Sequence, residues 1–233
     1  MTNIKSNRKF FLALTVALLL PFSFYVIAKI LKKDQLTMPR YYHPEKWVES
    51  TVDGKNSVDT VYHVVNDIVL RNQMGDSISL NNDLKGKMLL VEVFFTDCQS
   101  ICPNLTQNIS YFLHKAFKKN DTTVHFVSIS IDPENDSVAA LKAYSERFNV
   151  NPDHWWFLTG NRGEIYNYLR NELKLMVKPS DNGAEELDHT PTLVLIDKNR
   201  FIRGYYNGLD TTALKQCADD IGLISMQKKH KKK

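Results

Sequence analysis

Apolar positions along the chain form one long run near the start and several shorter runs afterwards. The long run spans Phe10 to Ala28 and contains no charged residue. At about 1.5 Å per residue it is long enough to cross a bilayer core of roughly 30 Å. We therefore predict a transmembrane anchor over residues 10–28, preceded by a short N-terminal segment over residues 1–9. A signal peptide cleaved after Val26-Ile27-Ala28 is the alternative that this pattern leaves open.

The most apolar of the shorter runs extends from Leu89 to Phe95. Such a run is typical of a strand that is buried on both faces, as in a parallel sheet. It ends at Thr96-Asp97-Cys98, and Pro103 follows Cys102 at a position that suits the first turn of a helix. We therefore expect both cysteines at the junction between a buried strand and a helix.

The remaining runs alternate between the residue spacing of strands and that of helices, which predicts an α/β domain with parallel strand pairing. A turn at residues 73–76 between two strand-like segments predicts a β-hairpin before the buried strand. The expected strands are 61–65, 68–71, 77–80, 124–131, 193–196 and 201–206, residues 155–160 form a strand or a loop, and the expected helices are 103–120, 137–148, 161–173 and 211–221.

Three segments are polar rather than apolar, two of them at the ends of this domain and one inside it. Residues 29–59 carry two prolines and predict a polar spacer between the anchor and the domain. Residues 174–188 predict a long polar loop, and loops of that length are often functional. Residues 223–233 form a basic tail. The folded domain is therefore expected over residues 60–222.

The net charge of +4 reflects the two ends of the chain rather than the domain. Residues 35–227 contain nineteen basic and twenty-five acidic side chains. An acidic domain offers little attraction to a phosphate backbone, so we predict no nucleic-acid partner.

Three cysteines are too few for a disulfide scaffold. Cys98 and Cys102 are expected at the start of a helix, where unpaired backbone N–H groups and the helix dipole favour thiolates. Two low-pKa sulfurs can exchange disulfides or bind a soft metal ion, and the Cys-x-x-x-Cys spacing is one residue longer than the redox Cys-x-x-Cys. Cys217 follows helical spacing with apolar neighbours, so we assign it to the core.

Three stretches resemble the Sco/SenC family of membrane-anchored copper proteins: Phe95–Pro103, Ser130–Asp136 and Asp188–Thr190. The resemblance covers about residues 60–222. It implies an α/β thioredoxin-like fold with an N-terminal β-hairpin extension, preceded by one transmembrane helix. Thr190-Pro191-Thr192 is also similar to the entry to a strand in thioredoxins, where the proline is cis and faces the redox cysteines.

The same resemblance implies one copper ion per chain, bound by Cys98, Cys102 and His189. Two thiolates and an imidazole suit copper(I) and also accommodate copper(II). Asp188 is expected to orient the imidazole, or alternatively to be a solvated loop carboxylate. Pro191 is expected to fix the backbone beside the site. We expect His63, His114 and His125 to be packing or surface residues and His230 to belong to the charged tail. His43 and His154 lie in polar or turn segments, and the sequence indicates no partner for either.

The function implied by the resemblance is that of a metallochaperone that delivers copper to the copper centre of cytochrome c oxidase. The alternative is a thiol–disulfide oxidoreductase that acts on cysteines of the oxidase subunit or of exported proteins, so whether the protein is an enzyme is left open. A peroxidase of the peroxiredoxin type is disfavoured because no isolated peroxidatic cysteine precedes Cys98. The expected location is the inner (cytoplasmic) membrane, with the domain on the outer, periplasmic side, and another thiol protein is a further expected partner, as reductant.

Overall fold

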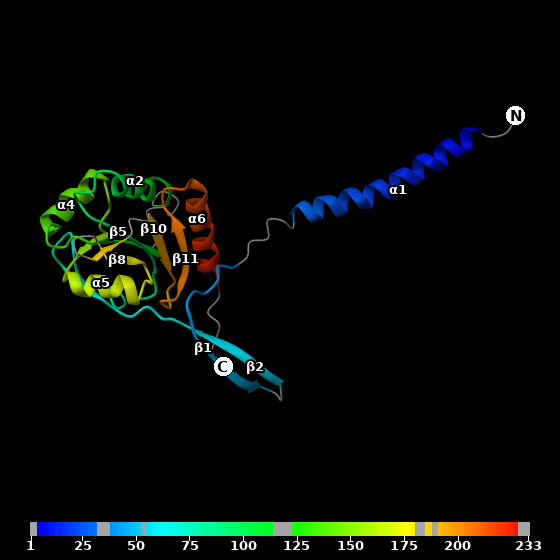
Figure 1. Ribbon diagram of the computed structural model, residues 1–233. Coiled ribbons are helices and arrows are strands. Elements are labelled where there is room, and N and C mark those ends of the chain that lie inside the picture. Colours follow the sequence, from blue (N-terminus) through cyan, green and yellow to red (C-terminus); the bar gives the residue numbers. More distant parts are fainter. Residues whose placement is uncertain are drawn as a thin grey trace. The chain divides into compact units, whose positions relative to one another are not determined.

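The computed structural model describes residues 4–31, 38–52, 55–113, 123–179, 185–187 and 191–227. The chain divides into two compact units, Met1–Thr37 and Met38–Lys233 (Figure 1). The first unit contains α1, a single helix over Ile4–Leu31. Its segment Phe10–Ile27 has a mean hydropathy of 2.3 and is long enough to cross a membrane, a test that a signal sequence also satisfies.

A seven-stranded sheet forms the centre of the second unit, with the strand order β11-β10-β5-β6-β7-β3-β4. β5 pairs in parallel with β6, β6 pairs in parallel with β7, and β10 pairs antiparallel with both β5 and β11. The strands of this sheet are β3 (Val69–Asn72), β4 (Ser77–Ser79), β5 (Met88–Phe94), β6 (Val124–Ser130), β7 (Trp155–Thr159), β10 (Thr192–Ile196) and β11 (Ile202–Asn207).

Helices cover both faces of this sheet, as Figure 1 shows. Apolar residues of α2, α4 and α6 form the core on one face, and apolar residues of α5 and of the segments before β3 and after β4 belong to the core on the other. The helices are α2 (Ile101–Asn108), which continues as a π-helical turn over Ile109–Leu113, α4 (Val138–Arg147), α5 (Arg162–Asn171) and α6 (Thr211–Met226). The expected α/β layering is therefore confirmed.

β5 is the interior strand that its apolar sequence predicts. Six of its seven residues are buried, and it has a paired strand on each side. Its apolar side chains enter the cores on both faces of the sheet. The exception in composition is Glu92, which is only 2% exposed. Burial of a carboxyl group costs free energy unless hydrogen bonds replace its lost water, and Glu92 has such a bond from Ser128.

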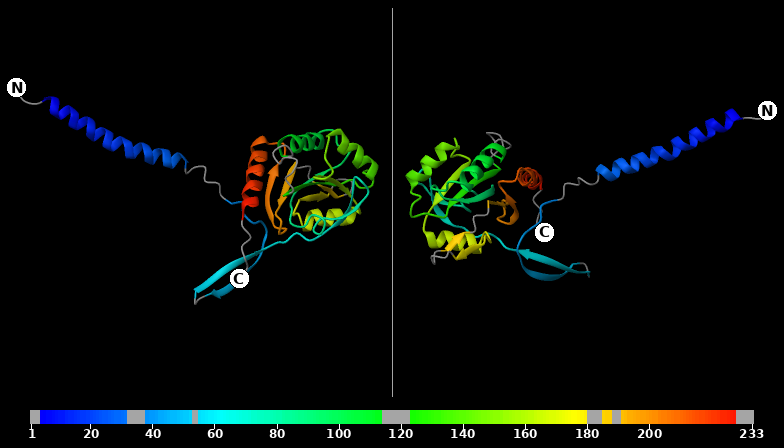
Figure 2. Two further views of the ribbon diagram at one scale, coloured as in Figure 1. Left: turned by 180° about the vertical axis from the view of Figure 1, so that it is seen from behind. Right: turned by 45° about the horizontal axis from the view of Figure 1, so that its top comes forward.

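The predicted hairpin before the buried strand is present as β3 and β4, but residues 61–65 do not form a strand of the main sheet. Instead β1 (Pro44–Val52) and β2 (Lys55–Tyr62) form a separate antiparallel hairpin, visible in Figure 2. This hairpin lies largely within the range predicted to be a polar spacer. The compact unit also begins at Met38 rather than near residue 60. That residues 29–59 separate the domain from a membrane stays a prediction.

Two other polar segments contain regular structure that the sequence pattern did not predict. The predicted loop 174–188 includes the short antiparallel strands β8 (Val177–Pro179) and β9 (Glu185–Leu187). α6 continues past residue 221 to Met226 because Ile224 is a further buried residue at helical spacing. The tail that was expected to begin at residue 223 therefore starts within a helix.

Candidate functional site

Cys98 and Cys102 lie where β5 ends and α2 begins, as predicted. The backbone N–H of Cys98 donates to the Phe95 carbonyl oxygen at 3.3 Å, which closes a tight turn directly after the strand. Ser100 is the N-cap residue of α2, but its side chain makes no capping hydrogen bond. The backbone N–H of Cys102 points instead at Cys98 Sγ, 3.4 Å away. The Cys98 sulfur therefore lies in the place that a capping oxygen would otherwise take.

The two thiols have different acidities. Partial burial acts to raise the pKa of Cys98, but hydrogen bonds from the Cys102 thiol and from the backbone N–H groups of residues 100–102 outweigh it, so its pKa is lowered. Cys102 is only 7% exposed, and burial together with the adjacent Cys98 raises the pKa of Cys102 to about 12. The prediction of two low-pKa sulfurs is therefore correct for Cys98 and wrong for Cys102. The prediction fails for Cys102 because a helix start favours a thiolate only where the sulfur faces the free N–H groups.

Asp136 holds the turn that carries Cys98. Its carboxylate accepts hydrogen bonds from the Thr96 backbone N–H at 3.1 Å and from the Thr96 hydroxyl at 2.5 Å. It also accepts from the Ser130 hydroxyl at the end of β6, at 2.5 Å. Ser130–Asp136 was singled out as a stretch of sequence, but nothing in its pattern indicated that its last residue reaches the cysteine turn.

A second buried carboxyl group lies beneath α2. Glu92 of β5 accepts from the Ser128 hydroxyl at 2.5 Å, and the Thr106 hydroxyl of α2 lies 3.5 Å from the same oxygen. Burial raises the pKa of Glu92 to about 8, although both hydroxyls act to lower it. The carboxyl group is therefore largely protonated at neutral pH. Sequence reasoning missed its role because a lone acidic residue in an apolar run carries no signal of its environment.

The predicted third ligand falls in a part of the chain outside the described residues, as does its neighbour: His189 and Asp188 both lie in the gap 188–190. Within the described ranges, no group of three or more His, Cys, Asp or Glu side chains could hold a metal ion. The two thiols agree with the donor chemistry of a soft metal such as copper(I), and the histidine remains a prediction.

Pro191 marks where the chain re-enters the described structure. Because β10 runs antiparallel to β5, the start of β10 lies beside the end of β5, at the edge of the sheet that leads to Cys98. The Pro191 carbonyl oxygen accepts from the Gly208 backbone N–H at 2.7 Å, and the Asn108 side chain of α2 donates to the Gly208 carbonyl oxygen at 3.0 Å. A side chain at Gly208 would collide with Leu105 of α2. The entry to β10 and the cysteine helix are therefore tied together. The cis state expected for the Thr190–Pro191 bond stays a prediction, because Thr190 lies outside the described residues.

Cys217 is a core residue, as predicted. Its side chain is fully buried on α6, and burial with nearby Asp220 raises its pKa. All three cysteines are free thiols in this structure.

Four of the remaining histidines are in described parts of the chain. His63 lies 2.8 Å from a carboxylate oxygen of Glu45 and 3.1 Å from one of Glu172, and His43 contacts the Tyr205 hydroxyl at 2.6 Å. His125 is completely buried against the Trp156 ring, with 4.2 Å between the ring centroids. His154 is partly buried. These placements confirm the packing roles expected for His63 and His125, while His114 and His230 lie outside the described residues.

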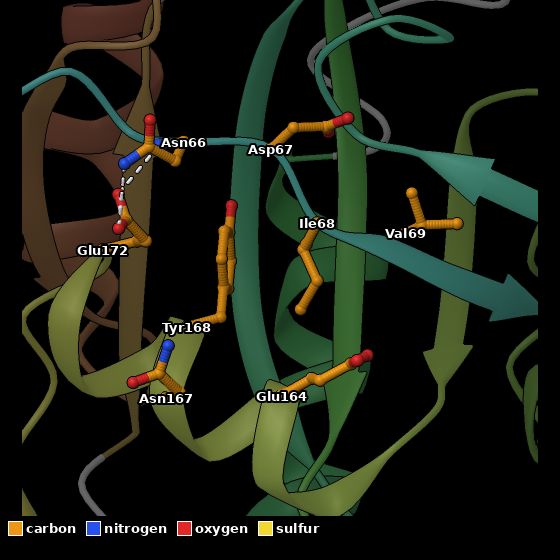
Figure 3. Close-up of a pocket in the computed structure, with 8 residues that line it drawn as sticks. All are labelled: Asn66, Asp67, Ile68, Val69, Glu164, Asn167, Tyr168 and Glu172. Atoms are coloured by element: carbon orange, nitrogen blue, oxygen red, sulfur yellow. Dashed lines mark hydrogen bonds between the residues drawn. The ribbon is translucent and has the colours of Figure 1, made fainter.

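A pocket of about 370 Å³ lies between α5 and the segment that leads into β3 (Figure 3). Glu172, one of three acidic residues that line it, accepts from the Asn66 backbone N–H at 2.8 Å and from the Asn66 side chain at 3.1 Å. That carboxylate is thus already used to fix the loop. The pocket is lined by Asn66, Asp67, Ile68, Val69, Glu164, Asn167, Tyr168 and Glu172, none of which belongs to the cysteine turn or to α2.

Known proteins are similar to this chain in sequence and in fold. The SCO1 protein homolog of Bacillus subtilis is 30% identical over 176 residues, which cover 75% of this chain and 90% of the relative. BsSco, described as a member of the Sco family of cytochrome c oxidase assembly proteins with a disulfide switch, matches with a TM-score of 0.61 and 29% identity over 71% of this chain and 95% of its own. ScoI of Bradyrhizobium japonicum with copper bound matches with a TM-score of 0.55 and 28% identity over 68% of this chain and 98% of its own.

These structural matches confirm the expected thioredoxin-like fold. A family model described as SCO1/SenC matches residues 57–222, which include β5, the cysteine turn and both sheet cores. Because this match covers more than half of the sequence, the chain belongs to the SCO1/SenC family.

Proposed function

We propose that this protein binds one copper ion per chain through Cys98, Cys102 and His189 and passes it to the copper centre of cytochrome c oxidase. Two relatives support the proposal, since BsSco is described as a cytochrome c oxidase assembly protein and ScoI of Bradyrhizobium japonicum has a structure with copper bound. The copper ion is cargo in this scheme, so the site must bind it and also release it.

The observation that carries the proposal is the contact between the Cys102 backbone N–H and Cys98 Sγ, at 3.4 Å. It provides an electron-rich sulfur at a partly exposed position, with a second sulfur directly behind it. Thiolates are ligands that copper(I) prefers. Loading must release the proton of Cys102, because a metal ligand binds in its deprotonated form.

The start of β10 supports His189 as the third ligand. Pro191, two residues further on, is fixed through Gly208 to the helix that bears Cys102. In our proposal Asp188 orients the imidazole and Pro191 holds the backbone from which the histidine extends. Transfer to the partner then proceeds by exchange of one thiolate ligand at a time.

The proposal also covers location and redox state. α1 would anchor the protein in the inner (cytoplasmic) membrane, with the domain on the outer, periplasmic side, where the copper centre of the oxidase would be within reach. A disulfide between Cys98 and Cys102 has no thiolate to offer, so another thiol protein would reduce it before loading.

The test is copper(I) affinity of the full-length protein in detergent, measured by competition with a chromophoric chelator. Cys98→Ser, Cys102→Ser and His189→Ala should each lower the affinity by orders of magnitude. Cys217→Ala and His154→Ala are matched controls, because they remove the same side-chain types elsewhere in the domain, and both should bind copper as the parent does. Full retention of copper affinity by His189→Ala would remove the three-ligand site.

A second candidate function is thiol–disulfide exchange, and the unequal acidity of the two thiols favours it. A partly exposed sulfur with a lowered pKa beside a buried sulfur with a raised pKa suits a nucleophile and its resolving partner. Turnover of a disulfide substrate should then survive in His189→Ala, whereas copper affinity should not. An enzyme assay and the chelator competition on that one variant separate the two functions.

A further inference from the structure

Asp136 is an almost fully buried carboxylate that lies on neither strand nor helix. It is 1% exposed, at the end of the connection between β6 and α4. Burial of a carboxylate is unfavourable unless hydrogen bonds replace its lost water. Asp136 has three such donors: the Thr96 backbone N–H, the Thr96 hydroxyl and the Ser130 hydroxyl.

The connection that carries Asp136 is itself fixed. The backbone N–H groups of Asn135 and Asp136 both donate to the Asp132 carbonyl oxygen, at 3.1 and 2.9 Å. Directly after Asp136, the Ser137 side chain caps α4 by accepting from Ala140 N–H. The carboxylate is therefore held between a tight turn and a capped helix, so it can act as a fixed point for the segment opposite.

That opposite segment is the turn that bears Cys98. Beyond the last paired residues of β5 and β6, the Ile131 backbone N–H still donates to the Phe94 carbonyl oxygen at 2.9 Å. Two residues after Phe94, Thr96 donates both its backbone N–H and its hydroxyl to Asp136. Two residues later the Cys98 sulfur meets the N-terminus of α2. A shift of Thr96 would move Cys98 relative to Cys102, whose position α2 sets independently.

We propose that Asp136 is a positioning residue of the dithiol: by binding Thr96, it fixes the separation and orientation of the Cys98 sulfur relative to Cys102. The part of this inference that concerns copper rests on the proposed function, whereas the part that concerns the dithiol does not. Asp136 touches neither sulfur and acts only through Thr96.

The expected change in copper affinity follows from the indirect role of Asp136, which acts on Cys98 through Thr96. Groups that orient metal ligands from one layer further out typically change metal affinity by about 10–100-fold when they are removed. In Asp136→Asn an NH₂ group replaces one carboxylate oxygen and cannot accept. At Oδ1 it loses the bonds from the Thr96 N–H and hydroxyl, and at Oδ2 it loses the bond from the Ser130 hydroxyl and the 3.3 Å contact from the Thr96 N–H. We expect copper(I) affinity of this variant to fall about 10–100-fold. Because the structure is that of the free dithiol, we also expect the variant to favour the disulfide about tenfold more than the parent does, which is the effect of losing one hydrogen bond to a charged group.

The experiment uses the full-length protein in detergent and measures three quantities for each variant. These are copper(I) affinity by chelator competition, the dithiol–disulfide equilibrium against a glutathione buffer, and the thermal unfolding midpoint. Thr96→Val removes one donor to Asp136 and should reproduce part of the effect, whereas Thr96→Ser keeps the hydroxyl and should restore parent values. Asp197→Asn is the matched control, because Asp197 is also a buried carboxylate, 2% exposed, but it pairs with Arg203.

The control separates positioning from general destabilisation. Asp197→Asn should lower the unfolding midpoint while it leaves copper affinity and the dithiol equilibrium unchanged. Parent-like values of both quantities in Asp136→Asn and Thr96→Val would overturn the inference, and so would equal losses in Asp136→Asn and Asp197→Asn. If Asp136→Asn does not fold, the same three quantities are compared between Thr96→Val and Thr96→Ser, and equal values in these two variants would overturn the inference. If the parent protein binds no copper, the proposed function fails, and the dithiol equilibrium alone still tests Asp136.

Discussion

Replacement of Glu92 by glutamine is expected to stabilise the folded domain at neutral and alkaline pH and to have little effect in mild acid. Burial raises the pKa of Glu92 from 4.5 to about 8, against the opposing hydrogen bonds from Ser128 and Thr106. In the unfolded chain the same carboxyl group titrates near its ordinary value. Between these two pH values the folded protein therefore holds a proton that the unfolded chain has released.

Stability must fall as the pH rises through this window, because the folded state binds more protons than the unfolded state. Each pH unit within it changes the free energy of unfolding by ~1.4 kcal/mol, so by pH 7 the loss relative to mild acid is about 3 kcal/mol. Glutamine resembles the protonated carboxyl group and does not titrate. Its NH₂ group would replace Glu92 Oε2, which has no hydrogen-bond partner among the described residues, so the substitution breaks no bond.

The assay is urea unfolding of the protein without residues 1–37, the point at which the structure divides into two units. The free energies of unfolding of parent and Glu92→Gln should agree near about pH 5 and diverge by a few kcal/mol near about pH 8. Glu164→Gln is the control, since Glu164 is an exposed carboxylate on α5. A difference between parent and Glu92→Gln that stays constant over the whole pH range would refute the reasoning.

Three further predictions concern other buried groups. Burial, with Lys87 and His154 nearby, lowers the pKa of His125 to about 3. The stability that this group contributes is therefore fully present above about pH 6.5 and is lost as the pH falls toward about 3. His125→Phe should shift the midpoint of acid unfolding, followed by tryptophan fluorescence, to lower pH. A pulse of iodoacetamide followed by mass spectrometry should label Cys98 first and Cys217 only after unfolding, and early label on Cys217 would contradict its place in the core. Arg203→Ala should cost about 3–5 kcal/mol in urea unfolding, because it leaves the Asp197 carboxylate buried without its cationic partner at 2.9 Å, and a loss below about 1 kcal/mol would contradict that role.

The parts of the fold that sequence predicted are those with a buried face. β5 could be predicted because its apolar residues enter two cores, and α4 and α6 because their apolar residues recur at helical spacing. β1 and β2 could not be predicted in this way. Their described side chains are mostly exposed on both faces, including Trp47 and Val58 on one of them, so no alternation of buried and exposed positions marks them as strands.

The same limit applies to the site. Cys98 and Cys102 could be placed at the junction because the end of a buried run and a proline mark it in the sequence. The acidity of Cys102 was predicted wrongly because it depends on burial beneath the turn. The partners of Asp136 and Glu92 come from segments far apart in the chain, and spacing within one segment cannot reveal them.

The burial of Cys217 also determines which covalent bond the protein can form. Three cysteines allow three different pairs. Cys98 and Cys102 close a very short loop, whereas any bond to Cys217 would close a loop of more than a hundred residues, at a higher entropic cost. Once α6 has packed, Cys217 is also withdrawn from thiol exchange, so both of its pairs are blocked. In the folded chain, Cys98 and Cys102 are therefore the two thiols left to pair with each other.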